Sequence, residues 1–81
     1  MAIMRILSSR GDTSVEWDRH GLDTADSEAQ AAVLEAQRVF DAQRASGATA
    51  FAVAPGRPAE RLDAFDPSAE QIIVVPRVAG G

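Results

Sequence analysis

The sequence predicts a small α+β domain in which one helix packs across a mixed β-sheet. Three observations lead to this fold class. An apolar segment with strand character lies near each end of the chain, at 2–7 and 72–75. A helical pattern occupies 27–46, and an alternating segment follows it at 49–54. The predicted order is strand, strand, helix, strand, short strand, strand, with no internal repeat and no long linker.

The first two strands are predicted to form a β-hairpin. Residues 2–7 are rich in large apolar side chains, and the alternation at 13–17 places Thr13, Val15 and Trp17 on one face. Residues 8–12 between them supply the small residues and the glycine that a tight connection uses. The two segments are therefore expected to pair as neighbours.

The helix is predicted to run from Ser27 to Ser46, after a polar entry at 22–26. Ser27 and Gln30 have the spacing of a capping box, and Gly47 is suited to end the helix in the left-handed conformation. Apolar side chains recur at intervals of three and four residues, which lines one helical face and predicts that this face covers the sheet. This stripe consists of Ala29, Ala32, Val33, Ala36, Val39 and Phe40.

The segment 49–54 alternates small and large residues, which predicts a strand with Phe51 and Val53 directed at the core. Pro55 and Gly56 are expected to end it. A short edge strand is expected at 61–64, followed by a turn at 66–68.

The final strand, 72–75, is β-branched at every position, which is typical of a central strand that is covered on both faces or flanked by parallel neighbours. Pro76 lacks a backbone N–H and is expected to end the strand. Placing the first and last strands side by side at the centre buries the most area, and a helix crossover makes that pair parallel. The prediction is a domain over 1–76 with a C-terminal tail over 77–81.

Composition excludes several classes of function. The chain has 81 residues and a net charge of −4, and its arginines are scattered, which argues against nucleic-acid binding. A domain this short leaves little volume for a deep catalytic cleft, so an enzyme is not expected. No segment has the length and apolarity of a signal peptide or a membrane span. We therefore expect a cytoplasmic protein that does not bind membranes.

Two residue types are missing from the chain. Cysteine is absent, which excludes disulfides and thiolate metal sites. Lysine is also absent, so all eight basic side chains are arginines. The sequence therefore contains no side-chain amine.

No catalytic or metal-binding group is predicted. His20 is the only histidine, and the sequence around it predicts a solvent-exposed loop with no nucleophile at a recognisable spacing. Asp63 and Asp66 lack the ligand series and the glycine of a calcium loop. Gly56, Gly80 and Gly81 do not form a phosphate-binding loop. No bound cofactor is expected.

The remaining chemical feature is the Gly80-Gly81 pair that follows the last strand. A glycine backbone enters a narrow channel without a Cβ that would clash, so another enzyme could bring the Gly81 carboxylate to ATP and form an acyl adenylate. The adenylate could then react with a thiol, an amine or sulfide. Small residues are also common at chain ends without any function.

The element order and residues 72–81 together resemble the β-grasp ubiquitin-like superfamily. The segment 76–81 is similar to the tail of the sulfur-carrying subunit of molybdopterin synthase, which usually has two prolines before a small-residue Gly-Gly end. Here Arg77 stands in place of the second proline. The chain therefore looks more similar to the small ubiquitin-like modifiers of bacterial conjugation systems.

The resemblance implies a carrier that is the substrate of a ubiquitin-activating-type enzyme, which would use ATP. Gly81 would be adenylated and attached, Gly80 would be its spacer, and Arg77, Val78 and Ala79 would be recognised by the activating enzyme. A modifier would end in a bond to target proteins, with a conjugating enzyme and a deconjugating protease as further partners. The alternatives are a sulfur carrier with a C-terminal thiocarboxylate for cofactor biosynthesis, and a non-covalent ubiquitin-like binding module.

Overall fold

The computed structural model describes residues 1–8 and 11–77. Its elements are, in chain order, β1 (Ala2–Ile6), β2 (Thr13–Trp17), the 3-10 turn η1 (Gly21–Asp23), α1 (Ser27–Ala45), β3 (Thr49–Val53), β4 (Glu60–Leu62) and β5 (Gln71–Val75). The predicted α+β class and the predicted element order are confirmed. The sequence did not predict η1, and β4 begins one residue earlier and ends two residues earlier than the expected 61–64.

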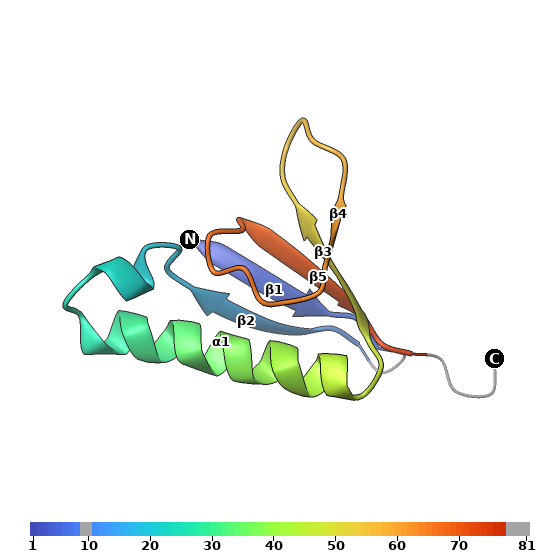
Figure 1. The fold of residues 1–81 in the computed structure, drawn as a ribbon, viewed down its shortest axis with the longest axis horizontal. Coiled ribbons are helices and arrows are strands. Elements are labelled where there is room, and N and C mark those ends of the chain that lie inside the picture. Colours follow the sequence, from blue (N-terminus) through green and yellow to red (C-terminus); the bar gives the residue numbers. More distant parts are fainter. Residues whose placement is uncertain (9–10, 78–81) are drawn as a thin grey trace.

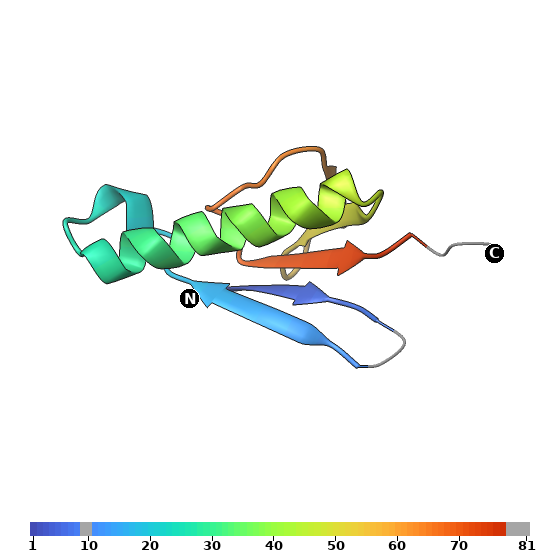
Figure 2. The same ribbon diagram turned by 90° about the horizontal axis from the view of Figure 1, so that it is seen from below.

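The strands form one five-stranded mixed sheet in the order β2-β1-β5-β3-β4. The central strands β1 and β5 are parallel, and the other three neighbouring pairs are antiparallel. Figures 1 and 2 show α1 lying across one face of this sheet while the other face stays open. The predicted parallel pair at the sheet centre is confirmed, and the arrangement is compatible with a β-grasp fold with one main helix.

The core lies between α1 and the covered face of the sheet. Phe40 and Trp17 are each 1% exposed, and the ring of Phe65 lies between them, with centroid separations of 5.7 Å from Phe40 and 5.2 Å from Trp17. The indole Nε1–H of Trp17 donates a hydrogen bond to the carbonyl of Pro67 at 2.8 Å, so the polar atom of this buried ring has a partner. The other buried side chains are Ala2, Met4, Ile6, Val33, Ala36, Ala48, Ala50, Ile72 and Val74.

The prediction that Phe51 and Val53 face the core is wrong. Ala50 is fully buried under α1, whereas Phe51 and Val53 lie on the open face and are half-buried. Phe51 is paired with Ile73 of β5, which is half-buried on the same open face. Alternation shows that successive side chains point to opposite faces, but it does not show which face a helix covers. The small Ala50 leaves room for the aromatic rings on the helix side.

The final strand is central, but it is covered on one face only. Ile72 and Val74 are fully buried under α1, whereas Ile73 is half-buried and Val75 is 40% exposed. Its neighbours are β1, which is parallel, and β3, which is antiparallel. The continuous β-branched run therefore reflects a central position in the sheet rather than burial on both faces.

The predicted capping box of Ser27 and Gln30 is wrong. Asp26 caps α1, because its Oδ1 accepts hydrogen bonds from the backbone N–H groups of Glu28 at 2.9 Å and Ala29 at 3.4 Å. Gln30 instead donates from its side chain to the carbonyl of Thr24 at 2.6 Å. The carboxylate of Asp26 also carries the charge that a helix N-terminus favours.

The turn η1 packs tightly against α1 at Gly21. A Cβ built on Gly21 would lie 2.6 Å from Val33 Cγ2 and 2.7 Å from the carbonyl oxygen of Ala29. Gly21→Ala is therefore expected to lower the free energy of unfolding by about 1–3 kcal/mol, because the helix backbone cannot yield easily. Urea denaturation followed by circular dichroism checks this value. A Gly21→Ala protein with parental stability would contradict the close approach.

Candidate functional site

The candidate site begins where β5 leaves the sheet. Val75 forms the last pair of β5 with Thr49 of β3, and Pro76 follows without an N–H to extend the ladder. Figures 1 and 2 show that β5 runs within the sheet toward the end of the molecule opposite the N-terminus. Of the predicted site residues, Arg77 is described and is exposed. Val78, Ala79, Gly80 and Gly81 lie outside the described residues.

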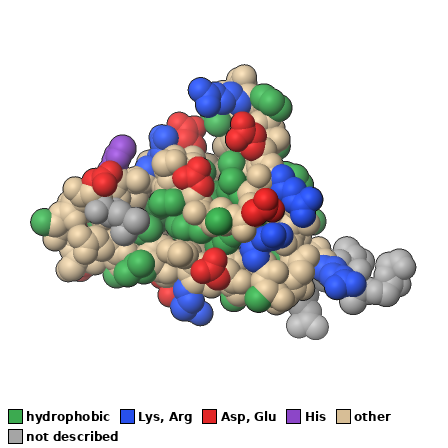
Figure 3. All heavy atoms as spheres, viewed as in Figure 1, with side chains coloured by type: hydrophobic (Ala, Val, Ile, Leu, Met, Phe, Trp, Pro, Cys, Tyr) green, Lys and Arg blue, Asp and Glu red, His purple; other side chains and the backbone are tan. Residues whose placement is uncertain are grey.

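Arginines gather around the start of the tail. Arg44 Nη2 and Arg61 Nε lie 3.7 Å and 3.9 Å from the same carboxylate oxygen of Asp63. Arg44 also donates from Nη1 to the carbonyl of Ala48 at 2.8 Å, next to Gly47. Gly47 in turn contacts the side chain of Arg77, since a Cβ built on this glycine would lie 3.1 Å from Arg77 Cδ. Figure 3 shows basic side chains near this end of the molecule.

Two guanidinium groups, those of Arg44 and Arg61, therefore share the carboxylate of Asp63, and the side chain of Arg77 lies against Gly47. The chain as a whole has a net charge of −4, so this positive region stands out against the remainder of the surface. We name Arg44, Arg61 and Arg77 the basal arginines. The sequence predicted only Arg77 as a site residue, because the other two come from α1 and β4 and are brought together at Asp63 only by the fold.

His20 lies in the exposed turn that precedes η1. This side chain is exposed, and the backbone N–H of His20 donates to Asp18 Oδ1 at 2.8 Å at the start of η1. The expected solvent-exposed loop histidine is confirmed. In residues 1–8 and 11–77, no set of three or more His, Asp or Glu side chains is arranged to hold a metal ion.

The two aspartates considered as calcium ligands have structural roles. Asp63 pairs with Arg44 and Arg61 as described above. Asp66 accepts hydrogen bonds at Oδ1 from the backbone N–H of Ser68 at 3.0 Å and from its hydroxyl at 2.6 Å. The backbone N–H of Ala69 donates to the carbonyl of Asp66 at 3.2 Å, which closes the predicted turn at 66–68.

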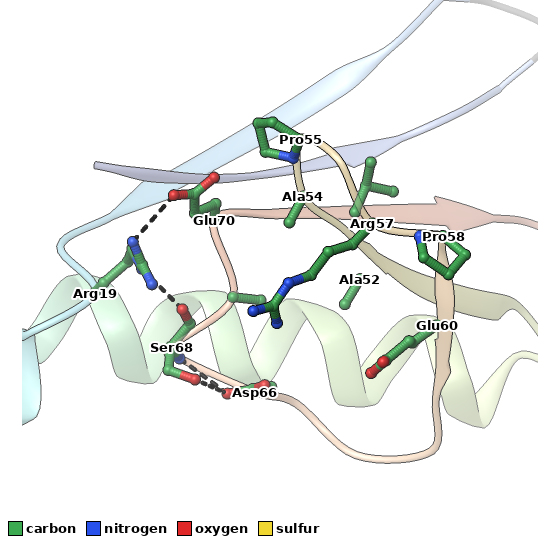
Figure 4. A pocket seen from close by; sticks show the side chains of 12 residues that line it. Arg19, Ala52, Ala54, Pro55, Arg57, Pro58, Glu60, Asp66, Ser68 and Glu70 are labelled. Carbon is green, nitrogen blue, oxygen red and sulfur yellow. Dashed lines mark hydrogen bonds and ion pairs between the residues drawn. The ribbon is translucent and has the colours of Figure 1, made fainter.

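A recess of about 540 Å³ lies at the other end of the sheet, between the β3–β4 connection and residues 66–70. Figure 4 shows the side chain of Arg57 extending into it from the β3–β4 connection. Arg19 closes one side by donating to the carbonyl of Ser68 at 2.8 Å and to Glu70 Oε1 at 3.3 Å. The recess unites three segments that are distant in sequence, so no local pattern could have predicted it.

One ion pair on the exposed face of α1 shifts the pKa of both of its members. The guanidinium of Arg38 donates a hydrogen bond from Nε to Glu35 at 2.9 Å, and this bond lowers the pKa of the Glu35 carboxyl. The same contact raises the pKa of Arg38. Both groups are exposed, so the pair contributes little to stability. Its contribution is present above the ordinary pKa of glutamate and is lost as the pH falls through the lowered pKa.

No helix in the described part of the chain is both long and apolar enough to cross a membrane. The chain was compared with protein-family models, curated proteins and solved structures, and none of them matches.

Proposed function

We propose that this protein is a ubiquitin-like modifier whose Gly81 carboxylate is adenylated by an activating enzyme and then joined to target proteins. The observation that carries the proposal is the position of β5. This strand is paired on both sides at the sheet centre, ends at Pro76 and leads directly into the Gly80-Gly81 segment. A carboxylate at this place is connected to a central strand of the domain that is paired on both sides.

The proposed reaction has two steps. In the first, a Gly81 carboxylate oxygen attacks the α-phosphorus of ATP, and pyrophosphate leaves. In the second, a nucleophile of the target attacks the Gly81 carbonyl carbon, AMP leaves, and the nucleophile loses its proton. Both steps take place in partner enzymes, so this chain needs no catalytic residues of its own.

The basal arginines support recognition by an enzyme with an acidic surface. Arg77 begins the tail and lies against Gly47, Arg44 donates to the carbonyl of the neighbouring Ala48, and Arg61 meets Arg44 at Asp63. Charge complementarity at such a place speeds association and orients the partner. Arg77 would be recognised together with Val78 and Ala79, and Gly80 would act as the spacer before Gly81.

The test is ATP–pyrophosphate exchange with the 81-residue chain and the ubiquitin-activating-type enzyme of the same organism. The modifier proposal expects exchange that depends on the chain, followed by protein adducts. An intact mass in which sulfur replaces oxygen at the carboxylate would instead assign the sulfur-carrier function. Absence of exchange would contradict both and favour a non-covalent binding module.

The absence of lysine limits the adducts that two copies can form with each other. No side-chain isopeptide bond to an amine is possible, so we expect any self-adduct at a backbone α-amino group or at a hydroxyl such as that of Ser8 or Ser14. Peptide mapping of a conjugation reaction by mass spectrometry checks this. An adduct through a side-chain nitrogen would contradict it.

A further inference from the structure

Gly47 ends α1 in a Schellman motif. Its φ is +93°, in the left-handed region that favours glycine. The backbone N–H of Gly47 donates to the carbonyl of Arg44, and that of Ala48 donates to the carbonyl of Gln43, each at 3.0 Å. This role explains the backbone conformation of Gly47. It does not explain why another side chain lies beside the position that a Cβ of residue 47 would occupy.

The register of the sheet brings Arg77 to the same place. β5 and β3 are antiparallel, with Val75 opposite Thr49 and Val74 opposite Ala50. Continuing this register by two residues places Arg77 opposite Gly47. A Cβ on Gly47 would lie 3.1 Å from Arg77 Cδ and 3.6 Å from Arg77 Cβ, so the arginine stem crosses directly over the glycine.

We propose that the aliphatic part, or stem, of the Arg77 side chain packs on Gly47 in the space that a side chain there would occupy, a contact that we call the seat. This contact sets the direction in which the tail leaves the domain. Gly47 and Arg77 are then positioning residues for the Gly81 carboxylate. The inference rests on the proposed function for its consequence, whereas the contact itself can be tested separately. It adds to Arg77 a role within the domain, besides the recognition that the sequence resemblance implied.

Two physical effects favour this seat. The C-terminus of α1 carries partial negative charge, which attracts the guanidinium of a residue that lies across it. The ring of Pro76 restricts its own φ, so few backbone dihedral angles remain free between β5 and Arg77. A contact that holds Arg77 therefore fixes the direction of the chain. A tail whose first residue is already oriented loses less conformational freedom when an enzyme binds it.

The structural test uses NMR on the 81-residue chain. The parent protein should show nuclear Overhauser contacts between the α protons of Gly47 and the δ protons of Arg77. Gly47→Ala should displace the Arg77 stem and change the chemical shifts of Pro76 and Arg77. Gly56→Ala is the matched control, because Gly56 also has a positive φ, +73°, but has no atom within 4 Å of a built Cβ.

The functional test measures pyrophosphate exchange as a function of chain concentration. Gly47→Ala is expected to raise the KM for the chain roughly tenfold with kcat unchanged, because the tail must be ordered during binding. Gly56→Ala should leave both constants unchanged. Gly47→Asn, which adopts a positive φ more easily than alanine, should act like Gly47→Ala and guards against poor folding of that variant.

A double-mutant cycle distinguishes loss of the contact between Gly47 and Arg77 from a distortion of the C-terminus of α1. If Gly47 acts through the Arg77 stem, Gly47→Ala has no further effect on KM in an Arg77→Ala background. Equal increases of KM in both backgrounds, or an equal effect of Gly56→Ala, would overturn the proposal. Absence of the NMR contact would overturn it too. If the parent chain supports no exchange, the proposed function fails, and the NMR contact alone then decides whether the seat exists.

Discussion

Phe40→Ala is expected to lower the free energy of unfolding by about 3–5 kcal/mol. Phe40 is 1% exposed and contacts the ring of Phe65, which in turn contacts Trp17. Removing the ring leaves a cavity between α1 and the sheet that small neighbours such as Ala36 and Ala50 cannot fill. A chain of this length has a stability of roughly 4–12 kcal/mol, so the loss is a large part of the total. Urea denaturation followed by circular dichroism measures it.

Leu34→Ala is the matched control on the same helix. Leu34 is 58% exposed, so its truncation should change the free energy of unfolding by no more than about 0.5 kcal/mol. Phe40→Leu, which keeps most of the buried apolar volume, should lose less than Phe40→Ala and remains measurable if the alanine variant does not fold. Equal stabilities of Phe40→Ala and Leu34→Ala would contradict the described core.

Gly80→Val is expected to reduce adenylation of the chain by about 100-fold or more. Under the proposed function, the last residues enter a narrow channel, and a branched side chain next to Gly81 would shift its carboxylate from the α-phosphorus of ATP. Deletion of Gly81 should abolish the reaction, because the remaining carboxylate does not reach. Pyrophosphate exchange, followed by intact mass measurement, records both effects.

Ala59→Val is the control for added side-chain volume at an exposed position in the β3–β4 connection, far from the tail. It should support exchange at the parental rate. The tail variants should unfold at the parental temperature, since the change lies beyond the last described contacts at Arg77. Full activity of the chain that lacks Gly81 would exclude the carrier function.

The residue pattern alone predicted the main helix, the five strands and their order along the chain, but not the turn η1. The spacing of Val33, Ala36 and Phe40 located α1 and its buried face, because a helical period of 3.6 leaves one face for an apolar stripe. The apolar runs at the two ends of the chain indicated the central parallel pair of β1 and β5, because burial favours placing them together. The Gly80-Gly81 pair and Arg77 were likewise found from sequence alone.

The face of the sheet that α1 covers, and the contacts between residues distant in sequence, could be assigned only from the three-dimensional fold. Alternation is symmetric between two faces, so Phe51 and Ala50 could be assigned only after the helix was placed. The contact between Arg77 and Gly47 follows from the register of β5 on β3, which is set by pairing across the sheet. The periodicity of apolar residues in a segment predicts only the type of that one element. A site at the end of a sheet depends on how several elements are placed relative to one another.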